Sequence, residues 1–183
     1  MIQLKHLPLD DISISSPYGA RSITVNGRYY WWHNGLDLKA QLNTPVYAVA
    51  DGEVMAARYD NSYGYYIAID HGKFGTLYAH LSHYKVTEGS IVKSGEIIGH
   101  TGNTGDTTGP HLHFEIRLGS YANFWERAHC DRSVFMNTID PMLFIEDFFN
   151  KKDNLSVEEA AKIVQSAAGL EDKTMDYIVK HYR

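Results

Sequence analysis

The sequence predicts a mainly β fold: an antiparallel β-sheet domain followed by a small C-terminal helical appendage. Three observations predict it. Stretches that alternate polar and apolar residues recur up to residue 118, which is the period of half-buried strands. Gly, Asn and Asp separate these stretches as turn residues, and no helical period interrupts them. After Lys151-Lys152-Asp153 the spacing becomes helical, so we place the domain at 1–150 and the appendage at 151–183.

The first part of the chain is expected to form a lead-in arm over residues 1–14 and then a hairpin. Asn26-Gly27 is a strong two-residue hairpin turn, and the far arm of the hairpin runs over 28–32 to His33. Asn34-Gly35 follows, and this pair makes a helix improbable. His33 and Asp37 are therefore expected on a turn that enters a strand.

The central part of the domain is expected to consist of short antiparallel strands. Its elements are two strands within 45–58 that turn at Asp51-Gly52, strands at 65–70 and 76–81, short strands and tight turns over 86–102, and a Gly/Thr loop over 103–110.

The stretch His111-Leu112-His113-Phe114-Glu115-Ile116-Arg117 alternates strictly and is expected to form a strand. Leu112, Phe114, Ile116 and Leu118 are predicted to face a core. His111, His113, Glu115 and Arg117 are predicted to face a cleft or solvent. Two histidines on one strand face can serve one site.

The C-terminal part is expected to contain an aromatic-rich insertion at about 119–139 and then two helices. Ser156-x-x-Glu159 is a capping box that opens the first helix, and Gly169 fits its C-cap. The second helix reaches Arg183 without a stop signal, which leads us to expect a truncated chain.

Composition excludes several classes of protein. The net charge of −5 argues against a nucleic-acid partner, and Cys130 is the only cysteine, which excludes an internal disulfide or a Cys-only metal site. No apolar run approaches the ~18 residues that a membrane span needs. The N-terminus lacks the apolar segment of a signal peptide, so we expect synthesis in the cytoplasm and release by another route.

The histidines and one aspartate suggest a hydrolytic zinc site. His33 and Asp37 form a His-x-x-x-Asp pair, and His113 is a third candidate ligand on a rigid strand. Three protein ligands and one open position are typical of catalytic zinc. His80 and His111 then remain as groups for proton transfer, since the unperturbed pKa of histidine is about 6.5.

At these residues the sequence resembles the lysostaphin-type (LytM-like) zinc metalloendopeptidases, which cut peptide bonds in bacterial peptidoglycan. The resemblance covers about residues 13–118, and Asp140-Pro141 resembles the family's usual close. The matching motifs are Tyr18-Gly19-Ala20-Arg21, His33-Asn34-Gly35-Leu36-Asp37, Tyr78-Ala79-His80-Leu81, and Gly102 to Glu115 with its Gly-Pro-His-Leu-His-Phe-Glu ending.

The resemblance implies an open groove, Zn²⁺ on His33, Asp37 and His113, and a catalytic pair of His80 and His111. No catalytic position is replaced, whereas degenerate relatives that activate amidases without cutting usually lose ligands. The insertion and the helices lie outside the family pattern. They resemble the added modules of phage or prophage wall-degrading proteins, and the helices could bind a partner or lead into further chain. We therefore expect action at the bacterial cell wall after release, or within a phage particle.

Further roles are expected around the metal. Trp31, Trp32 and Tyr78 are predicted to bind substrate, because aromatic faces pack against sugars and extended peptides. Glu115 either orients a ligand imidazole or pairs with Arg117, and the sequence leaves both open. The sequence also leaves open the bond cleaved and which of His80 and His111 is the base.

Two rival functions compete with the peptidase. The first is a non-catalytic wall-binding or amidase-activating module, which the complete ligand set disfavours. The second is a biotinyl or lipoyl carrier, suggested by the glycine rhythm of residues 89–99; such a domain needs a modifiable lysine at a hairpin tip and no His/Asp set.

Overall fold

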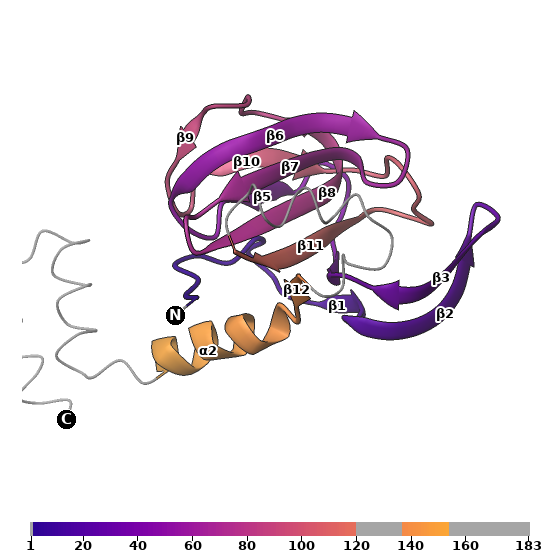
Figure 1. The fold of residues 1–183 in the computed structure, drawn as a ribbon, viewed down its shortest axis with the longest axis horizontal. Coiled ribbons are helices and arrows are strands. Elements are labelled where there is room, and N and C mark those ends of the chain that lie inside the picture. Colours follow the sequence, from indigo (N-terminus) through magenta and orange to yellow (C-terminus); the bar gives the residue numbers. More distant parts are fainter. Residues whose placement is uncertain (1, 120–136, 154–183) are drawn as a thin grey trace, which may run out of the picture. The chain divides into compact units, whose positions relative to one another are not determined.

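The computed structural model describes residues 2–119 and 137–153 of the 183-residue chain (Figure 1). The chain divides into two compact units, Met1–Ile145 and Glu146–Arg183. The expected insertion and the two expected C-terminal helices fall largely or wholly outside the described residues. No described helix has the length and apolarity needed to cross a membrane.

The first unit is built almost entirely of strands, as predicted. The described elements are β1 (Ile14–Ser16), β2 (Gly19–Val25), β3 (Arg28–His33), β4 (Leu36–Lys39), β5 (Pro45–Tyr47), β6 (Gly52–Asp60), β7 (Gly64–Asp70), β8 (Phe74–Tyr84), β9 (Ile91–Val92), β10 (Ile97–Thr101), β11 (His111–Leu118), β12 (Thr138–Ile139) and the helix α2 (Met142–Asp153).

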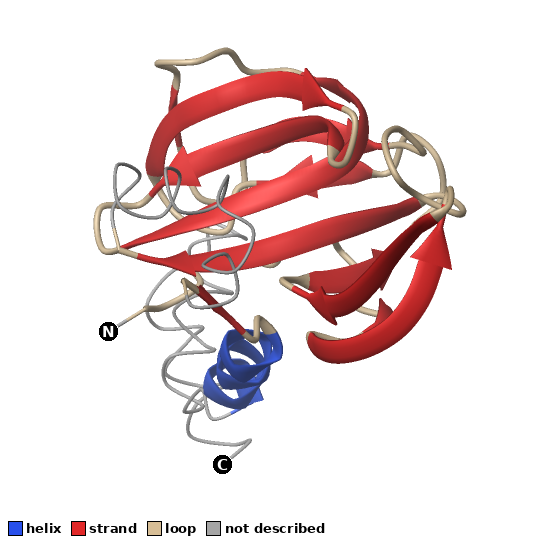
Figure 2. Cartoon of the chain, turned by 45° about the vertical axis from the view of Figure 1, so that its right-hand side comes forward, coloured by secondary structure: helices blue, strands red, loops and turns tan. Residues whose placement is uncertain are grey.

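Ten of these strands, which Figure 2 draws in red, form one antiparallel sheet. Its main path runs in the order β1-β4-β11-β8-β7-β6-β9. Outside this path, β10 pairs with β5 and β8, and β12 pairs with β11. Strand β11 lies between β4 and β8, so its side chains meet neighbours from both strands. The mainly antiparallel fold class is confirmed.

The burial of β11 corrects two predictions. Leu112, Phe114 and Ile116 are fully buried as expected, but Leu118 is 40% exposed at the end of the strand. Arg117, predicted to face a cleft or solvent, is only 1% exposed, and Glu115, although it lines a pocket as predicted, is 0% exposed. Alternation assigns residues to opposite faces, but it does not say that both faces of a central strand are covered.

Strands β2 and β3 form a separate two-stranded sheet, the hairpin that stands beside the larger sheet in Figure 1. Val25 pairs with Arg28 across the turn. Asn26 and Gly27 have φ angles of 50° and 80°. Positive φ at both central residues is what a type I′ turn requires, so the Asn-Gly prediction is confirmed.

The helix α2 was not predicted. Asp140 caps it by accepting a hydrogen bond from the amide of Met142 at 2.9 Å, and Pro141 precedes the first helical residue. Asp140 followed by Pro141 is a helix-start signal, since Asp is a favoured N-cap residue and Pro is favoured in the first turn. The division between the units falls inside this helix, after Ile145, whereas the composition of the sequence predicts it at residue 150.

Candidate metal centre

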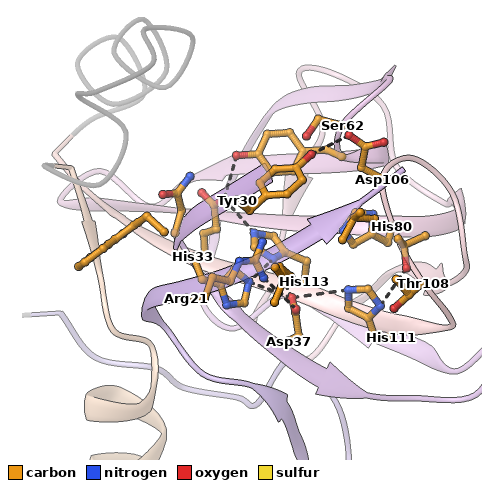
Figure 3. Close-up of a pocket in the computed structure, with 17 residues that line it drawn as sticks. Arg21, Tyr30, His33, Asp37, Ser62, His80, Asp106, Thr108, His111 and His113 are labelled. Atoms are coloured by element: carbon orange, nitrogen blue, oxygen red, sulfur yellow. Dashed lines mark hydrogen bonds and ion pairs between the residues drawn. The ribbon is translucent and has the colours of Figure 1, made fainter. Parts of the chain in front are cut away.

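Three side chains from three strands converge at one end of β11, as the close-up shows (Figure 3). His33 Nε2 lies 3.1 Å from Asp37 Oδ1 and 3.0 Å from His113 Nδ1. His113 Nδ1 lies 2.8 Å from Asp37 Oδ1. Among the described residues, His33, Asp37 and His113 form the group whose donor atoms are close enough to hold one metal ion.

Strand register explains how distant parts of the chain meet here. β4 and β11 are antiparallel, and Asp37 is directly opposite His113. Directly opposed residues share a sheet face, so the two side chains lie close together. His33 ends β3 and returns the chain to this position through Asn34-Gly35.

Gly35 permits that return. A Cβ at Gly35 would lie 2.5 Å from the carbonyl oxygen of Phe114 and 2.9 Å from Cε1 of His113. Such distances are far inside van der Waals contact. Within the His-Asn-Gly-Leu-Asp motif, the glycine therefore lets the turn pack directly on β11.

Hydrogen bonds on the outer side of each ligand ring select the tautomer. His33 Nδ1 donates to the carbonyl of Pro17 at 2.7 Å, and His113 Nε2 donates to Glu115 Oε1 at 2.9 Å. The lone pairs of His33 Nε2 and His113 Nδ1 therefore both point toward Asp37 Oδ1. Three electron pairs that converge without an intervening cation repel one another. Two imidazoles and one carboxylate are ligands that zinc favours, so the donor set fits Zn²⁺.

The electrostatics of the donor set lead to the same conclusion. Burial would raise the pKa of Asp37, but the close approach of the His111, His113 and His33 rings outweighs burial and holds this pKa well below its usual range. Burial would lower the pKa of His113, but the close approach of the Asp37 and Glu115 carboxylates raises it to about 9. Both shifts mean that the cluster stabilises positive charge.

Two further histidines stand beside the donor set. His80 Nδ1 donates to the carbonyl of Thr104, and His111 Nδ1 donates to the carbonyl of Gly109, both at 2.8 Å. Their ring centroids are 4.7 Å apart. Both carbonyl acceptors belong to the loop between β10 and β11. Because each ring carries its proton on Nδ1, the Nε2 atom of each ring can accept a proton.

His80 and His111 differ in their surroundings. Burial lowers the pKa of His80 to about 3, and the neighbouring His113 and His111 rings lower it further electrostatically. The backbone of His80 has a φ of 59°, a conformation that is uncommon for residues other than glycine. His111 Nε2 lies 3.5 Å from Asp37 Oδ1, so this ring faces the donor set directly.

The five histidine and aspartate positions line one pocket between the large sheet and the hairpin (Figure 3). Its lining residues are Arg21, Ile23, Val25, Tyr30, Trp32, His33, Asn34, Asp37, Ser62, Tyr63, His80, Asp106, Thr107, Thr108, His111, His113 and Glu115.

The aromatic residues predicted to bind substrate fall in three different places. Trp32 lines the pocket, whereas Trp31, its neighbour on β3, is 52% exposed and is absent from the lining. Tyr78 is fully buried, and its hydroxyl accepts hydrogen bonds from the Val49 amide and from Thr76. The prediction that Tyr78 contacts substrate is therefore wrong, because its side chain belongs to the core.

Glu115 combines the two alternatives that the sequence left open. Its Oε1 accepts a hydrogen bond from His113, and its Oε2 accepts one from Arg117 Nε at 2.6 Å. The carboxylate can do both because it is fully buried between these partners.

Sequence reasoning missed the roles of three residues around the pocket. Tyr63 donates a hydrogen bond to Glu115 Oε1 at 2.9 Å. Arg21 NH1 lies 3.8 Å from Asp37 Oδ2, and its place in the Tyr-Gly-x-Arg motif is the signal that could have found it. Asp106 accepts hydrogen bonds from Tyr30 and Arg28 of the hairpin. Tyr63 and Asp106 lie in loops, where strand periodicity gives no signal.

A family model described as peptidase family M23 matches residues 32–124, which include every one of the five positions. The chain belongs to peptidase family M23.

Curated relatives of the M23 domain come from several bacteria. The DD-carboxypeptidase/endopeptidase Mpg of Neisseria meningitidis serogroup B is 43% identical over 114 residues, which are 61% of this chain and 26% of the relative. The peptidoglycan DD-endopeptidase ShyA of Vibrio cholerae is 46% identical over 104 residues, which are 56% of this chain and 24% of the relative. The chain thus spans about a quarter of the length of these relatives.

Solved structures agree with the M23 fold. The catalytic domain of the antimicrobial peptidase lysostaphin from Staphylococcus simulans superposes with a TM-score of 0.63 at 32% identity, covering 78% of this chain and 99% of that domain. A zinc-containing peptidase from Vibrio cholerae gives a TM-score of 0.62 at 32% identity, covering 77% of this chain and 40% of that one.

Proposed function

We propose that this M23 domain is a zinc-dependent endopeptidase that hydrolyses peptide bonds in the stems or cross-bridges of bacterial peptidoglycan. One observation carries the proposal: three converging lone pairs stand beside two histidines whose Nδ1 atoms both donate to backbone carbonyls. The names of the relatives Mpg, ShyA and lysostaphin support the same class of activity.

His33, Asp37 and His113, which line the pocket, would hold the zinc ion. When bound, zinc acts as a Lewis acid that polarises a carbonyl and makes a water molecule more acidic. Arg21 NH1, 3.8 Å from Asp37 Oδ2, helps to keep the Asp37 carboxylate oriented toward the other two ligands.

His80 and His111 would move the proton. An Nε2 acceptor on one ring takes the proton of the attacking water, and a protonated ring donates a proton to the leaving amine. The hydrogen bonds of both Nδ1 atoms to backbone carbonyls keep each ring in the tautomer that this role needs. Because their ring centroids lie 4.7 Å apart, we expect both histidines to act on one scissile bond.

The hairpin would supply the wall against which an extended peptide packs. Tyr30, Trp32 and Val25 present aromatic and apolar surface to the pocket. Trp32 is the tryptophan expected to touch the peptide near the scissile bond. Trp31 lies outside the lining and would contact only a larger, polymeric substrate.

The second candidate function is a non-catalytic module that binds the cell wall or activates amidases. A domain that only binds has no need of a complete donor set together with two tautomer-locked histidines, so the geometry favours the enzyme. In either case the site of action that we propose is the bacterial cell wall, where the polymer lies.

The test is digestion of purified peptidoglycan sacculi that carry different cross-links. The soluble products are analysed by mass spectrometry, and new amino termini identify the bond cleaved. We expect release of peptides that stops after zinc is removed with a chelator and returns when zinc is added back. Binding to sacculi without new amino termini would instead establish the non-catalytic module.

A further inference from the structure

We infer that Tyr63 and Arg117 are positioning residues that clamp Glu115 against His113 and thereby fix the metal-binding tautomer of this histidine. The inference deepens the proposed function, on which it rests, since it assumes that His113 Nδ1 binds zinc. It assigns a role to two residues that lie outside the donor set.

The clamp consists of three hydrogen bonds to one carboxylate and a fourth between two of its donors. Glu115 Oε1 accepts hydrogen bonds from His113 Nε2 and from the Tyr63 hydroxyl, both at 2.9 Å. Glu115 Oε2 accepts one from Arg117 Nε at 2.6 Å. Arg117 NH2 also donates to the Tyr63 hydroxyl at 3.2 Å, which closes the network. Each carboxylate oxygen therefore has its own partner, so the carboxylate cannot rotate away from His113.

Burial makes this arrangement decisive for the tautomer. Glu115 and Arg117 are 0% and 1% exposed, so water does not compete for the carboxylate. A neutral imidazole carries one proton, and an ionised carboxylate at Nε2 keeps the proton there. His113 Nδ1 is then left with its lone pair toward Asp37 and His33. Metal-ligating histidines commonly depend on an outer carboxylate in this way.

Tyr63 also links the ligand to the proton-transfer side of the site. Its carbonyl accepts a hydrogen bond from the amide of His80 at 2.8 Å. This bond supports His80 in its unusual backbone conformation, with a φ of 59°. The Tyr63 ring lies 5.8 Å from the His113 ring, at an interplanar angle of 39°. One loop residue thus touches both halves of the pocket.

A purely structural role is the rival explanation, because a buried ion pair can simply belong to the core. The zinc affinity of variants distinguishes the positioning role from the purely structural role. A positioning role requires that zinc binding weakens when the clamp is cut, while a core role changes stability without changing the affinity of the folded protein.

The experiment compares three variants of the full chain. Tyr63→Phe removes the hydroxyl but keeps the ring and the carbonyl that holds His80. Glu115→Gln places an amide NH₂ against a donor of either Arg117 or His113. Tyr78→Phe is the matched control: it also removes a fully buried tyrosine hydroxyl with two hydrogen bonds, but it does not touch the pocket.

The measurements are the zinc dissociation constant by chelator competition, the absorption spectrum with Co²⁺ in place of zinc, and the melting temperature. We expect Glu115→Gln to weaken zinc binding by about 10–100-fold, with an altered Co²⁺ spectrum. Tyr63→Phe should weaken zinc binding less, by about 3–10-fold. Tyr78→Phe should bind zinc like the wild type even if its melting temperature falls.

Two results would overturn the inference: wild-type zinc affinity and Co²⁺ spectrum in Tyr63→Phe, or an equal loss of affinity in Tyr78→Phe. If Glu115→Gln does not fold, the zinc affinity of Tyr63→Phe alone decides between the positioning role and the structural role. A wild type that binds zinc but cuts no peptidoglycan refutes the proposed function and leaves the affinity test intact. A wild type that binds no zinc refutes both.

Discussion

The two walls of the pocket are held in place by very different means. On the sheet side, His80 and His113 are both 7% exposed, and a hydrogen bond fixes each ring, to the Thr104 carbonyl and to Glu115 respectively. On the hairpin side, the strands are tied to the β10–β11 loop through Asp106, which accepts hydrogen bonds from Tyr30 at 2.6 Å and from Arg28 at 2.9 Å. The Arg28 side chain is 59% exposed.

The difference has energetic consequences. Exposed ion pairs such as Arg28–Asp106 contribute roughly 0–1 kcal/mol, whereas removing one partner of a buried pair costs about 3–5 kcal/mol. The sheet wall therefore fixes the reacting groups, and the hairpin wall can adapt to the peptide that it receives. Substitutions in the sheet wall should abolish chemistry, and those in the hairpin wall should change substrate binding.

The largest effect is expected when a ligand on the sheet wall is removed. His113→Ala deletes one of three protein donors, so the protein should purify with little zinc and should be inactive. The measurement is bound zinc per chain, set beside peptidoglycan turnover. Near-stoichiometric zinc in this variant would show that His113 is not a ligand.

The next effect separates proton transfer from metal binding on the same wall. His111→Ala and His80→Ala leave the three donors in place, so both should retain zinc. Turnover should fall by about 10²–10⁴-fold, the usual cost of losing a general acid or base. Zinc missing from His111→Ala but present in His113→Ala would reverse the two roles, and full activity in either variant would remove that histidine from the site.

On the hairpin wall, the two tryptophans should behave differently. Trp32→Ala should raise KM by about 5–30-fold on a small soluble peptide, which corresponds to ~1–2 kcal/mol of lost packing. Trp31→Ala should leave this KM unchanged, because its side chain is outside the pocket lining. Steady-state kinetics and melting temperatures of both variants test this difference. Equal KM values for the two variants would contradict it.

A smaller effect is expected from the contact between the hairpin and Asp106 of the β10–β11 loop. Asp106→Asn weakens an exposed ion pair worth at most about 1 kcal/mol, so KM should rise by no more than about fivefold. Glu88→Gln is the control, since Glu88 forms an exposed ion pair with Arg58 and does not line the pocket. An unchanged KM in Asp106→Asn would mean that this contact does not position the hairpin.

The smallest effect is expected when residues 154–183 are removed. A chain that ends at Asp153, the last residue of α2, should fold, bind zinc and cleave a small peptide like the full chain. The measurements are solubility, zinc content and turnover. Loss of zinc binding would show that residues 154–183 support the domain core.

The sequence by itself determined the strand periods, the Asn26-Gly27 hairpin and the positions of the five histidine and aspartate residues. These features are local, since turn chemistry and alternation depend on neighbouring residues. The motif spacing is equally local, and it is enough to propose His33, Asp37 and His113 as ligands and His80 and His111 as the catalytic pair.

Only the tertiary structure decided what surrounds these residues. Period-two alternation correctly placed Glu115 and Arg117 opposite Phe114, but it could not show that Tyr63 and the neighbouring strands bury them. The same limit explains Tyr78, whose polar hydroxyl finds its partners in the core rather than in the pocket. Burial and hydrogen-bond partners are set by strand register and loop packing between distant segments, and no local pattern encodes them.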